Sequence, residues 1–277
     1  MGTDIKATII GLLREIKDKK PLIHHITNYI SANDSANIVL AIGASPIMAE
    51  YAGEVEDVVA CASALVINIG MLNDVKLEAM LRAGKTANKL EVPVILDPVG
   101  AGVSSYRKEA LKELLKEVGF SVIRGNIAEI KVLCGMDSAL KGVDSDERHP
   151  DEGKAVAKLL AGSLNTVVAV TGKVDYISDG EKVASIENGH EILARITGAG
   201  CMATSLIAAY CGVTRDYFAA AVAGIATMGI AGEMGYEKLG TDEGSGSHKV
   251  YLMDAAYRFS GEDLLKRGKI YIHHAGS

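Results

Sequence analysis

A short glycine-rich segment, Thr197-Gly198-Ala199-Gly200-Cys201, precedes a run of good helix formers from Met202 to Tyr210. Two glycines allow a tight turn that exposes successive backbone N–H groups at the start of a helix, where the helix dipole adds positive potential. Such a turn can bind a phosphate or stabilise a developing oxyanion. The same glycines could instead serve only the close packing of the helix on a sheet, and these residues alone leave both interpretations open.

The segment also satisfies the G-x-G-x-x-A form of the dinucleotide-binding fingerprint, through Gly198, Gly200 and Ala203. A dinucleotide fold places that turn after its first strand and has an acidic residue about twenty positions later. Neither feature is present here, and the chain contains no G-x-x-x-x-G-K-[ST] motif. We therefore expect a phosphate-binding protein that uses neither a dinucleotide turn nor a P-loop.

Polar turns follow four short β-branched runs that are typical of buried strands. The runs are Leu65–Ile69, Val92–Leu96, Ser121–Ile123 and Thr166–Val170. The turns at their ends are Asn68-Ile69-Gly70, Asp97-Pro98-Val99-Gly100, Arg124-Gly125-Asn126 and Thr171-Gly172. One such turn is ordinary loop chemistry. Because the carboxyl ends of parallel strands meet at one edge of a sheet, the four together indicate a shared site.

Amphipathic stretches lie between these runs, with apolar residues three and four positions apart. They are Lys76–Leu90, Ser105–Val118 and Asp151–Ala161. The alternation of strand and helix predicts an α/β fold, in which helices cover both faces of a mostly parallel sheet. The stretch Phe218–Tyr236 is long and apolar, but it is rich in Ala and Gly and contains Glu233, which favours a buried core helix over a membrane span. No linker divides the chain, so we expect one domain over residues 1–277.

The composition favours a protein that acts on a small molecule. The 277 residues carry a net charge of −6 without long blocks of one sign, so the sequence lacks the electrostatic footprint of a nucleic-acid or membrane-binding protein. The segment Met1–Lys20 has no uninterrupted apolar stretch of the kind found in signal peptides. The four cysteines show no CxxC spacing, and we expect Cys61, Cys134 and Cys211 in the core. These features predict a cytoplasmic protein with reduced thiols.

Gly198-Ala199-Gly200 before a helix resembles the anion hole of ribokinase-like kinases, which usually have an aspartate next. Here Cys201 stands at that position. The cysteine variant occurs together with further motifs across residues 21–212. These are His25-Ile26-Thr27-Asn28, Gly43-Ala44-Ser45-Pro46-Ile47-Met48, Asn68-Ile69-Gly70, Leu96-Asp97-Pro98-Val99-Gly100-Ala101-Gly102, Arg124-Gly125-Asn126-Ile127-Ala128-Glu129-Ile130 and Lys141-Gly142-Val143-Asp144. The joint pattern resembles the hydroxyethylthiazole kinase family.

The resemblance implies a ribokinase-like three-layer α/β/α fold without a β lid. It also implies transfer of the γ-phosphate of ATP, with Mg²⁺, to the primary hydroxyl of 4-methyl-5-(2-hydroxyethyl)thiazole, for thiamine phosphate synthesis. Members of the family form homotrimers with active sites near the subunit interfaces.

Phosphoryl transfer passes through a loose, charge-spread transition state, so positioning and electrostatic stabilisation dominate its catalysis. The N–H groups of Gly198, Ala199 and Gly200 would hold the transferring phosphoryl group. Cys201 would lie where a base receives the hydroxyl proton, and the start of a helix can lower the pKa of a thiol.

Glu129 and Asp97 are our candidate ligands of Mg²⁺, partly through water. Glu129 could instead only complement the dipole of a helix, and Asp97 could be only a turn residue.

The resemblance assigns Arg124, Thr171 and Asn126 to ATP binding, and Met48, Gly198 and Asn28 to the thiazole. Without the resemblance, Arg124 could form a surface salt bridge, Thr171 could cap its own turn, and Met48 could fill a gap in the core.

Two other classes of function stay open. The first is another ribokinase-like enzyme, such as a hydroxymethylpyrimidine kinase or an ADP-dependent hydrate dehydratase, which would carry an aspartate at the position of Cys201. The second is a nucleotide-binding sensor without catalytic activity, for which the loss of that aspartate would be evidence.

Overall fold

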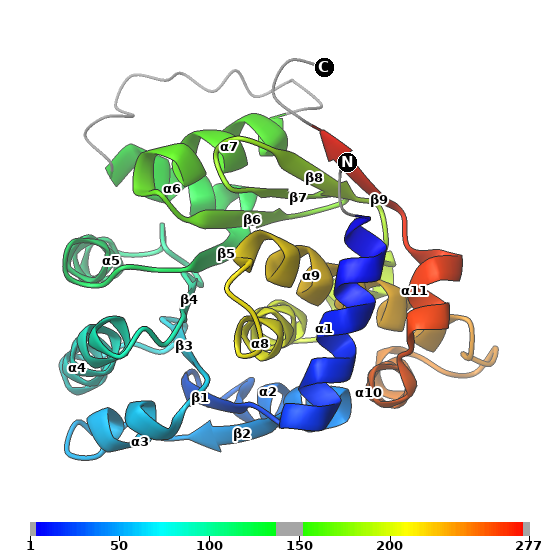
Figure 1. Cartoon of the computed structure of the whole chain (residues 1–277), viewed down its shortest axis with the longest axis horizontal. Helices are drawn as coiled ribbons and strands as arrows, with labels where there is room; N and C mark the ends of the chain where they lie inside the picture. Colours follow the sequence, from blue (N-terminus) through cyan, green and yellow to red (C-terminus); the bar gives the residue numbers. More distant parts are fainter. Residues whose placement is uncertain (1–3, 137–151, 274–277) are drawn as a thin grey trace.

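The computed structural model describes residues 4–136 and 152–273, so the Lys141–Asp144 motif lies outside the described residues. Within these two segments, nine strands form one sheet in the order β2-β1-β3-β4-β5-β6-β7-β8-β9 (Figure 1). Strands β1 to β6 pair in parallel, and β7, β8 and β9 extend the β6 edge in antiparallel fashion. The parallel strands therefore all direct their carboxyl ends to the same edge.

The strands are β1 Leu22–Ile26, β2 Ser45–Met48, β3 Ala64–Asn68, β4 Val94–Asp97, β5 Val122–Asn126, β6 Val167–Thr171, β7 Asp175–Ser178, β8 Val183–Ile186 and β9 Ile270–His273. The helices are α1 Ile5–Lys19, α2 Ala32–Ile42, α3 Val55–Cys61, α4 Asp74–Lys89, α5 Ser105–Glu117, α6 Ile127–Met136, α7 Glu152–Leu164, α8 Ala199–Cys211, α9 Tyr217–Tyr236, α10 Ser245–Arg258 and α11 Gly261–Arg267. A short 3₁₀ helix, Glu191–Arg195, precedes α8.

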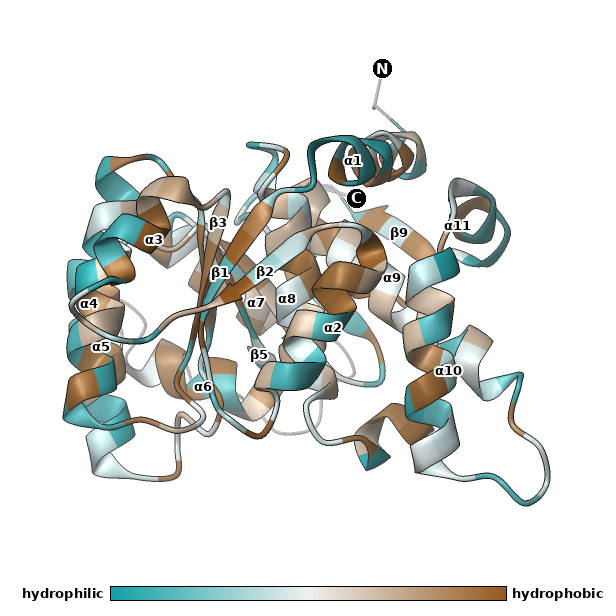
Figure 2. Cartoon of the chain, turned by 90° about the horizontal axis from the view of Figure 1, so that it is seen from below, coloured by the Kyte–Doolittle hydropathy of each residue, from teal (hydrophilic) through white to brown (hydrophobic). Residues whose placement is uncertain are grey.

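Helices cover both faces of the sheet (Figure 1). Helices α3 to α7 pack on one face, and α1, α2, α8, α9, α10 and α11 lie on the other. Successive residues of a strand point to opposite faces, so Val66 joins the core of the α8 layer, whereas Leu65 and Ile67 join the core of the α4 layer. Figure 2 shows the apolar strands at the centre and polar residues on the outer sides of α4 and α5. The predicted three-layer fold is confirmed.

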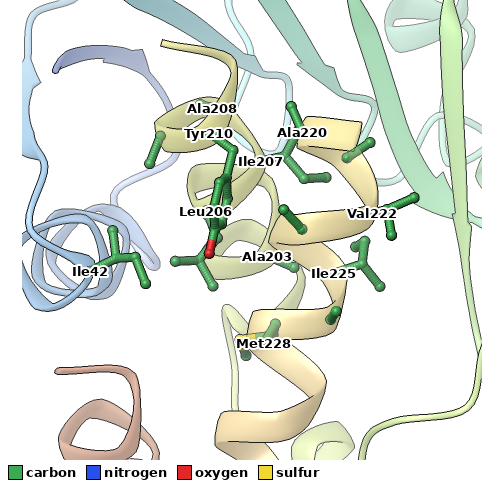
Figure 3. Close-up of a cluster of buried hydrophobic side chains, with 14 of the residues drawn as sticks. Ile42, Ala203, Leu206, Ile207, Ala208, Tyr210, Ala220, Val222, Ile225 and Met228 are labelled. Atoms are coloured by element: carbon green, nitrogen blue, oxygen red, sulfur yellow. The ribbon is translucent and has the colours of Figure 1, made fainter. Parts of the chain in front are cut away.

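Helix α9 is the core helix that the sequence predicts. It is long and apolar enough to cross a membrane, but 89% of its most apolar window is buried inside the protein. Figure 3 shows side chains of α8 and α9, among them Leu206, Ile207 and Ile225, in one buried cluster. A Cβ added at Gly224 of α9 would lie 2.6 Å from the backbone nitrogen of Ile207. The glycine therefore allows α8 and α9 to pack closely against each other.

The structure confirms four strands and five helices that the sequence predicts, α8 and α9 among them. Strands β3, β4, β5 and β6 each begin within two residues of the predicted run, and α4, α5 and α7 occupy the predicted amphipathic stretches. Strands β1, β2, β7, β8 and β9 were not predicted. Strand β1 contains two histidines and β2 contains Ser45 and Pro46, which interrupt an apolar pattern. Strands β7, β8 and β9 are only four residues long each, which leaves a short pattern to detect.

Candidate active site at the start of helix α8

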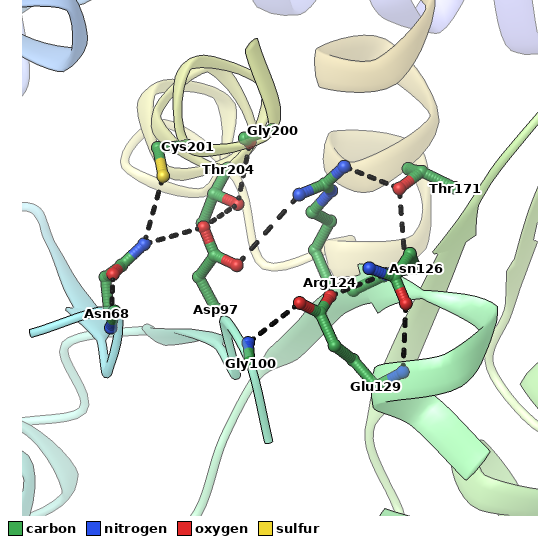
Figure 4. A network of polar contacts seen from close by, with 12 residues as sticks. Asn68, Asp97, Gly100, Arg124, Asn126, Glu129, Thr171, Gly200, Cys201 and Thr204 are labelled. Carbon is green, nitrogen blue, oxygen red and sulfur yellow. Dashed lines mark hydrogen bonds and ion pairs between the residues drawn. The ribbon is translucent and has the colours of Figure 1, made fainter. Parts of the chain in front are cut away.

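Helix α8 begins at Ala199, directly over the carboxyl edge of the parallel sheet (Figure 4). Gly198 caps it with a φ of +88°, and a Cβ at this position would lie 3.0 Å from the Cβ of Ser31. Glycine is therefore required here for backbone and steric reasons. The first-turn amides of Gly200 and Cys201 find no backbone acceptor among the described residues. The predicted glycine-rich turn is thus a helix start with free N–H groups at Gly200 and Cys201, whereas the N–H of Ala199 donates to Ile196 O at 3.3 Å.

Arg124 lies against this first turn from the end of β5. A Cβ added at Gly200 would clash with its guanidinium group. Arg124 Nη2 donates to Thr171 Oγ1 at the end of β6, and Thr171 Oγ1 in turn lies 3.3 Å from the carbonyl of Gly125. Only 13% of the Arg124 side chain is exposed, so a surface salt bridge is excluded. The arrangement places a cation beside the exposed amides.

Asp97 at the end of β4 is fully buried behind the helix start (Figure 4). Its Oδ2 accepts from Asn68 Nδ2 at 2.8 Å and from Thr204 Oγ1 at 3.1 Å. Its Oδ1 lies 4.0 Å from Arg124 Nη1 and has no hydrogen-bond partner among the described residues. Burial raises the pKa of Asp97, the Arg124 charge opposes this, and Glu129 adds to the rise.

Cys201 points from the same helix turn toward the ends of β1 and β3. Asn68 Nδ2 lies 3.3 Å from its sulfur, and Asn28 Nδ2 lies 3.6 Å from it. Burial and the negative charge of Asp97 raise the pKa of the thiol, although the two amides donate to the sulfur and oppose the rise. The expected lowering of this pKa is not found, because burial, the largest cause, raises it.

Glu129 lies in the first turn of α6 and hydrogen-bonds to the backbone there. Its Oε2 accepts from the Asn126 backbone N–H and Asn126 Oδ1 accepts from the Glu129 N–H, each at 2.9 Å. Its Oε1 accepts from the Gly100 N–H, also at 2.9 Å. The helix-terminus interpretation of Glu129 therefore holds, and the same contacts fix its carboxylate at the turn after β4.

The carboxylates of Asp97 and Glu129 fit a hydrated Mg²⁺. Asp97 Oδ1 is a buried oxygen without a hydrogen-bond partner in the described segments, and Glu129 is close enough to affect the pKa of Asp97. Within residues 4–136 and 152–273, no group of three or more His, Cys, Asp or Glu side chains could form a metal site by itself. A metal here would depend on water and substrate phosphates for most of its ligands.

Comparison with known proteins identifies the family. The model of the hydroxyethylthiazole kinase family matches residues 13–262. Hydroxyethylthiazole kinase of Alkaliphilus oremlandii is 51% identical over 96% of this chain and 98% of its own length. The corresponding protein of Clostridium tetani is also 51% identical, over 97% of this chain and 99% of its own.

The chain belongs to the hydroxyethylthiazole kinase family. A solved structure of hydroxyethylthiazole kinase from Pyrococcus horikoshii OT3 matches with a TM-score of 0.89 and 38% identity, over 97% of this chain and 100% of that one. Pyridoxal kinase from Staphylococcus aureus, solved in complex with ADP, matches with a TM-score of 0.65 at 15% identity, over 91% of this chain and 98% of that one, and shows the shared fold alone. The predicted family and its ribokinase-like fold are confirmed.

Two of the three residues that the family resemblance assigns to the thiazole, Asn28 and Met48, lie at neighbouring strand ends, and the third, Gly198, caps α8. Asn28 follows β1, donates to Asn68 Oδ1 at 3.0 Å and accepts from the Ser31 N–H at 3.0 Å, which fixes its amide beside Cys201. Met48 ends β2, opposite His25 of β1, and 39% of it is exposed. The interpretation of Met48 as a core residue is therefore wrong.

Three residues of this kinase site were not assigned from the sequence. Asn68 ends β3 within a turn that the sequence does single out, but nothing in the pattern predicts that it contacts both Asp97 and Cys201. Thr204 lies one helical turn after Gly200, where the four-residue spacing could have indicated a shared face. Asp175 opens β7 and accepts from the Gly172 N–H at 2.9 Å, and burial raises its pKa to about 7 against this hydrogen bond and the charge of Arg124.

The other cysteines of this kinase divide between core and surface. Cys211 is buried, as predicted, and Cys134 is half-buried. Cys61, predicted in the core, is exposed because it is the last residue of α3, which has only Val55 and Val59 buried.

Proposed function

We propose that the protein phosphorylates the primary hydroxyl of 4-methyl-5-(2-hydroxyethyl)thiazole, using ATP and Mg²⁺. The observation that supports this best is the start of α8, where free amides lie between the Arg124 guanidinium and the Cys201 thiol. The relatives named hydroxyethylthiazole kinase supply the substrate class. The comparisons do not favour a hydroxymethylpyrimidine kinase or a sensor without activity.

The proposed site has a nucleotide half and an alcohol half. Arg124, Thr171 and Asn126, at the ends of the adjacent strands β5 and β6, would hold the phosphates of ATP. Mg²⁺, held through water by Asp97 and Glu129, would neutralise the phosphate oxygens. The free amides of Gly200 and Cys201 would stabilise the charge that develops on the transferring phosphoryl group.

The alcohol half lies on the other side of the same helix turn. Asn28, Met48 and Gly198 would bind the thiazole so that its hydroxyl lies near Cys201. Because the raised pKa keeps the thiol protonated at neutral pH, we assign to it the orientation of the hydroxyl by a hydrogen bond. A loose transition state needs little removal of the hydroxyl proton before the phosphoryl group arrives, so a neutral thiol is compatible with the reaction.

An assay of the purified protein with ATP and Mg²⁺ tests the proposal. We expect the thiazole alcohol to be converted into its phosphate ester, detected by ³¹P NMR, with ADP formed in equal amount. The hydroxymethylpyrimidine alcohol serves as the competing substrate. Faster turnover of the pyrimidine would favour the other kinase, and ATP binding with neither product would favour the sensor.

Three further expectations stay predictions. We propose a homotrimer in which a neighbouring subunit covers the exposed apolar side chains at the ends of β1 and β2, Tyr29, Ile30, Met48 and Tyr51. We also propose one domain over residues 1–277, supported by the single sheet of the described residues, and a cytoplasmic location.

A further inference from the structure

Lys76, in the first turn of α4, is a buried lysine that the proposed reaction does not use. Only 4% of its side chain is exposed. Its Nζ donates to the carbonyl of Thr27 at 2.9 Å, lies 2.8 Å from Glu50 Oε2, and lies 4.4 Å from the centre of the Tyr29 ring. The hydroxyl of Tyr29 donates to the other oxygen of Glu50. These four residues form a closed cluster, which we call the Lys76 cluster.

The position of Lys76 is unfavourable for stability in two ways. Removing an ammonium group from water costs free energy that an ion pair only partly recovers. The first turn of a helix also carries positive partial charge, which favours acidic rather than basic residues. An apolar side chain would fill the same space without either cost, so stability alone does not explain a lysine here.

The Lys76 cluster joins the ends of three strands. Thr27 and Tyr29 flank Asn28 after β1, Glu50 lies two residues after Met48 of β2, and Lys76 belongs to the helix that follows β3. Two of the three proposed thiazole contacts, Asn28 and Met48, therefore lie within two residues of a cluster residue. No recorded contact of the cluster reaches Arg124, Thr171 or Glu129 within the described segments.

Glu50 is charged in this arrangement. Burial alone would raise the pKa of Glu50, but hydrogen bonds from Lys76 and Tyr29 bring it below its usual value. The cation of Lys76 thus lies between a carboxylate, a carbonyl and an aromatic face, all on segments beside the alcohol half of the site.

We propose that Lys76 is a positioning residue for the alcohol substrate. It holds Asn28 beside Cys201, and it holds the end of β2 beside Asn28. The proposal rests on the proposed function, because it takes the residues near Asn28 and Met48 as the side that receives the alcohol. Lys76 itself contacts neither substrate and acts through the backbone of Thr27 and the carboxylate of Glu50.

Steady-state kinetics of Lys76→Met separate this role from a general structural one. We expect KM for the thiazole alcohol to rise about 10- to 100-fold, as for a displaced positioning group, while KM for ATP changes by less than about twofold. Lys85→Met is the matched control, because Lys85 belongs to the same helix but pairs with Glu117 at the surface. The control should change neither constant. Glu50→Gln, a smaller disturbance of the same ion pair, should raise the alcohol KM in the same direction if Lys76→Met does not fold.

Backbone hydrogen exchange of the same variants supplies a readout that needs no turnover. The amides of residues 27–31 should exchange faster in Lys76→Met, and those of residues 124–129 should exchange at the wild-type rate. An unchanged alcohol KM, an equal rise in both KM values, or unchanged exchange at residues 27–31 would each overturn the proposal. If the wild-type protein does not phosphorylate the alcohol, the proposed function fails, and the exchange rates still decide whether Lys76 orders this loop.

Discussion

The side-chain amide of Asn68 contacts two ionisable groups of the site whose pKa values are raised, Asp97 and Cys201. Asn68 Nδ2 lies 2.8 Å from Asp97 Oδ2 and 3.3 Å from Cys201 Sγ. Asn28 in turn donates to Asn68 Oδ1, which also accepts from the Gly70 N–H. Because each polar atom of Asn68 is already engaged, the amide cannot rotate to favour one partner. The thiol and the carboxylate are therefore held at a fixed separation and affect each other electrostatically.

The charge of Asp97 raises the pKa of Cys201, so its removal should lower that pKa. We predict that Asp97→Asn increases the rate at which iodoacetamide alkylates Cys201 between about pH 7 and pH 9, because more of the sulfur is thiolate. Mass spectrometry in buffer without Mg²⁺ measures the rate at each cysteine. The exposed Cys61 serves as an internal control and should react as before. Slower or unchanged alkylation of Cys201 would show that Asp97 does not act on the thiol through its charge.

At the scale of elements, two glycines give the start of α8 its chemistry for different reasons. Gly198 provides a left-handed backbone conformation, with a φ of +88°, that turns the chain into the helix. Gly200 has no such requirement, and its missing Cβ leaves room for the Arg124 guanidinium. The sequence predicts the turn, but it cannot distinguish these two roles, because the second depends on a side chain from a distant strand.

The role of Gly200 leads to a test by a single methyl group. In Gly200→Ala the methyl should push Arg124 away from the helix start and weaken ATP binding by about tenfold, the worth of about 1.4 kcal/mol. The free energy of unfolding should change little, because the displaced atom is the end of a flexible side chain. Gly246→Ala in α10 is the control, since nothing lies within 4 Å of its added Cβ. Isothermal titration calorimetry with ATP measures both variants, and wild-type affinity in Gly200→Ala would contradict the contact.

At the scale of the whole molecule, the elements that could be predicted are those whose burial is continuous. Strands β3 to β6 lie at the centre of the sheet, so their β-branched runs are unbroken, and α4, α5 and α7 expose one polar face each. Strand β1 is just as buried but carries His24 and His25, whose rings bond to Ala49 O and Ser205 Oγ. Such tertiary partners make a polar sequence suitable for the core, and no local pattern reveals them.

The residues of the candidate site also differ in whether the sequence predicts their arrangement. Arg124 and Thr171 could be predicted as neighbours because each follows a predicted strand run, and the structure has them near the carboxyl ends of the adjacent parallel strands β5 and β6, where Asn126 pairs with Thr171. The full burial of Asp97, the raised pKa of Cys201 and the Lys76 cluster could not, since each depends on how α8 and α4 pack over the strand ends. The proposed alcohol half therefore lies at the ends of β1, β2 and β3, the proposed nucleotide half lies at the ends of β4, β5 and β6, and α8 begins between them.

The proposed phosphoryl transfer at the start of α8 requires the sulfur of Cys201 to lie beside the attacking hydroxyl and away from the nucleotide. Turnover and ATP affinity of Cys201→Ser test this most directly, with Cys61→Ser as the surface control. We predict that phosphorylation of the thiazole alcohol slows by at least about tenfold, while the Kd for ATP stays within about twofold of wild type. Wild-type turnover, or a large loss of ATP binding, would contradict the assigned place of Cys201 in the reaction.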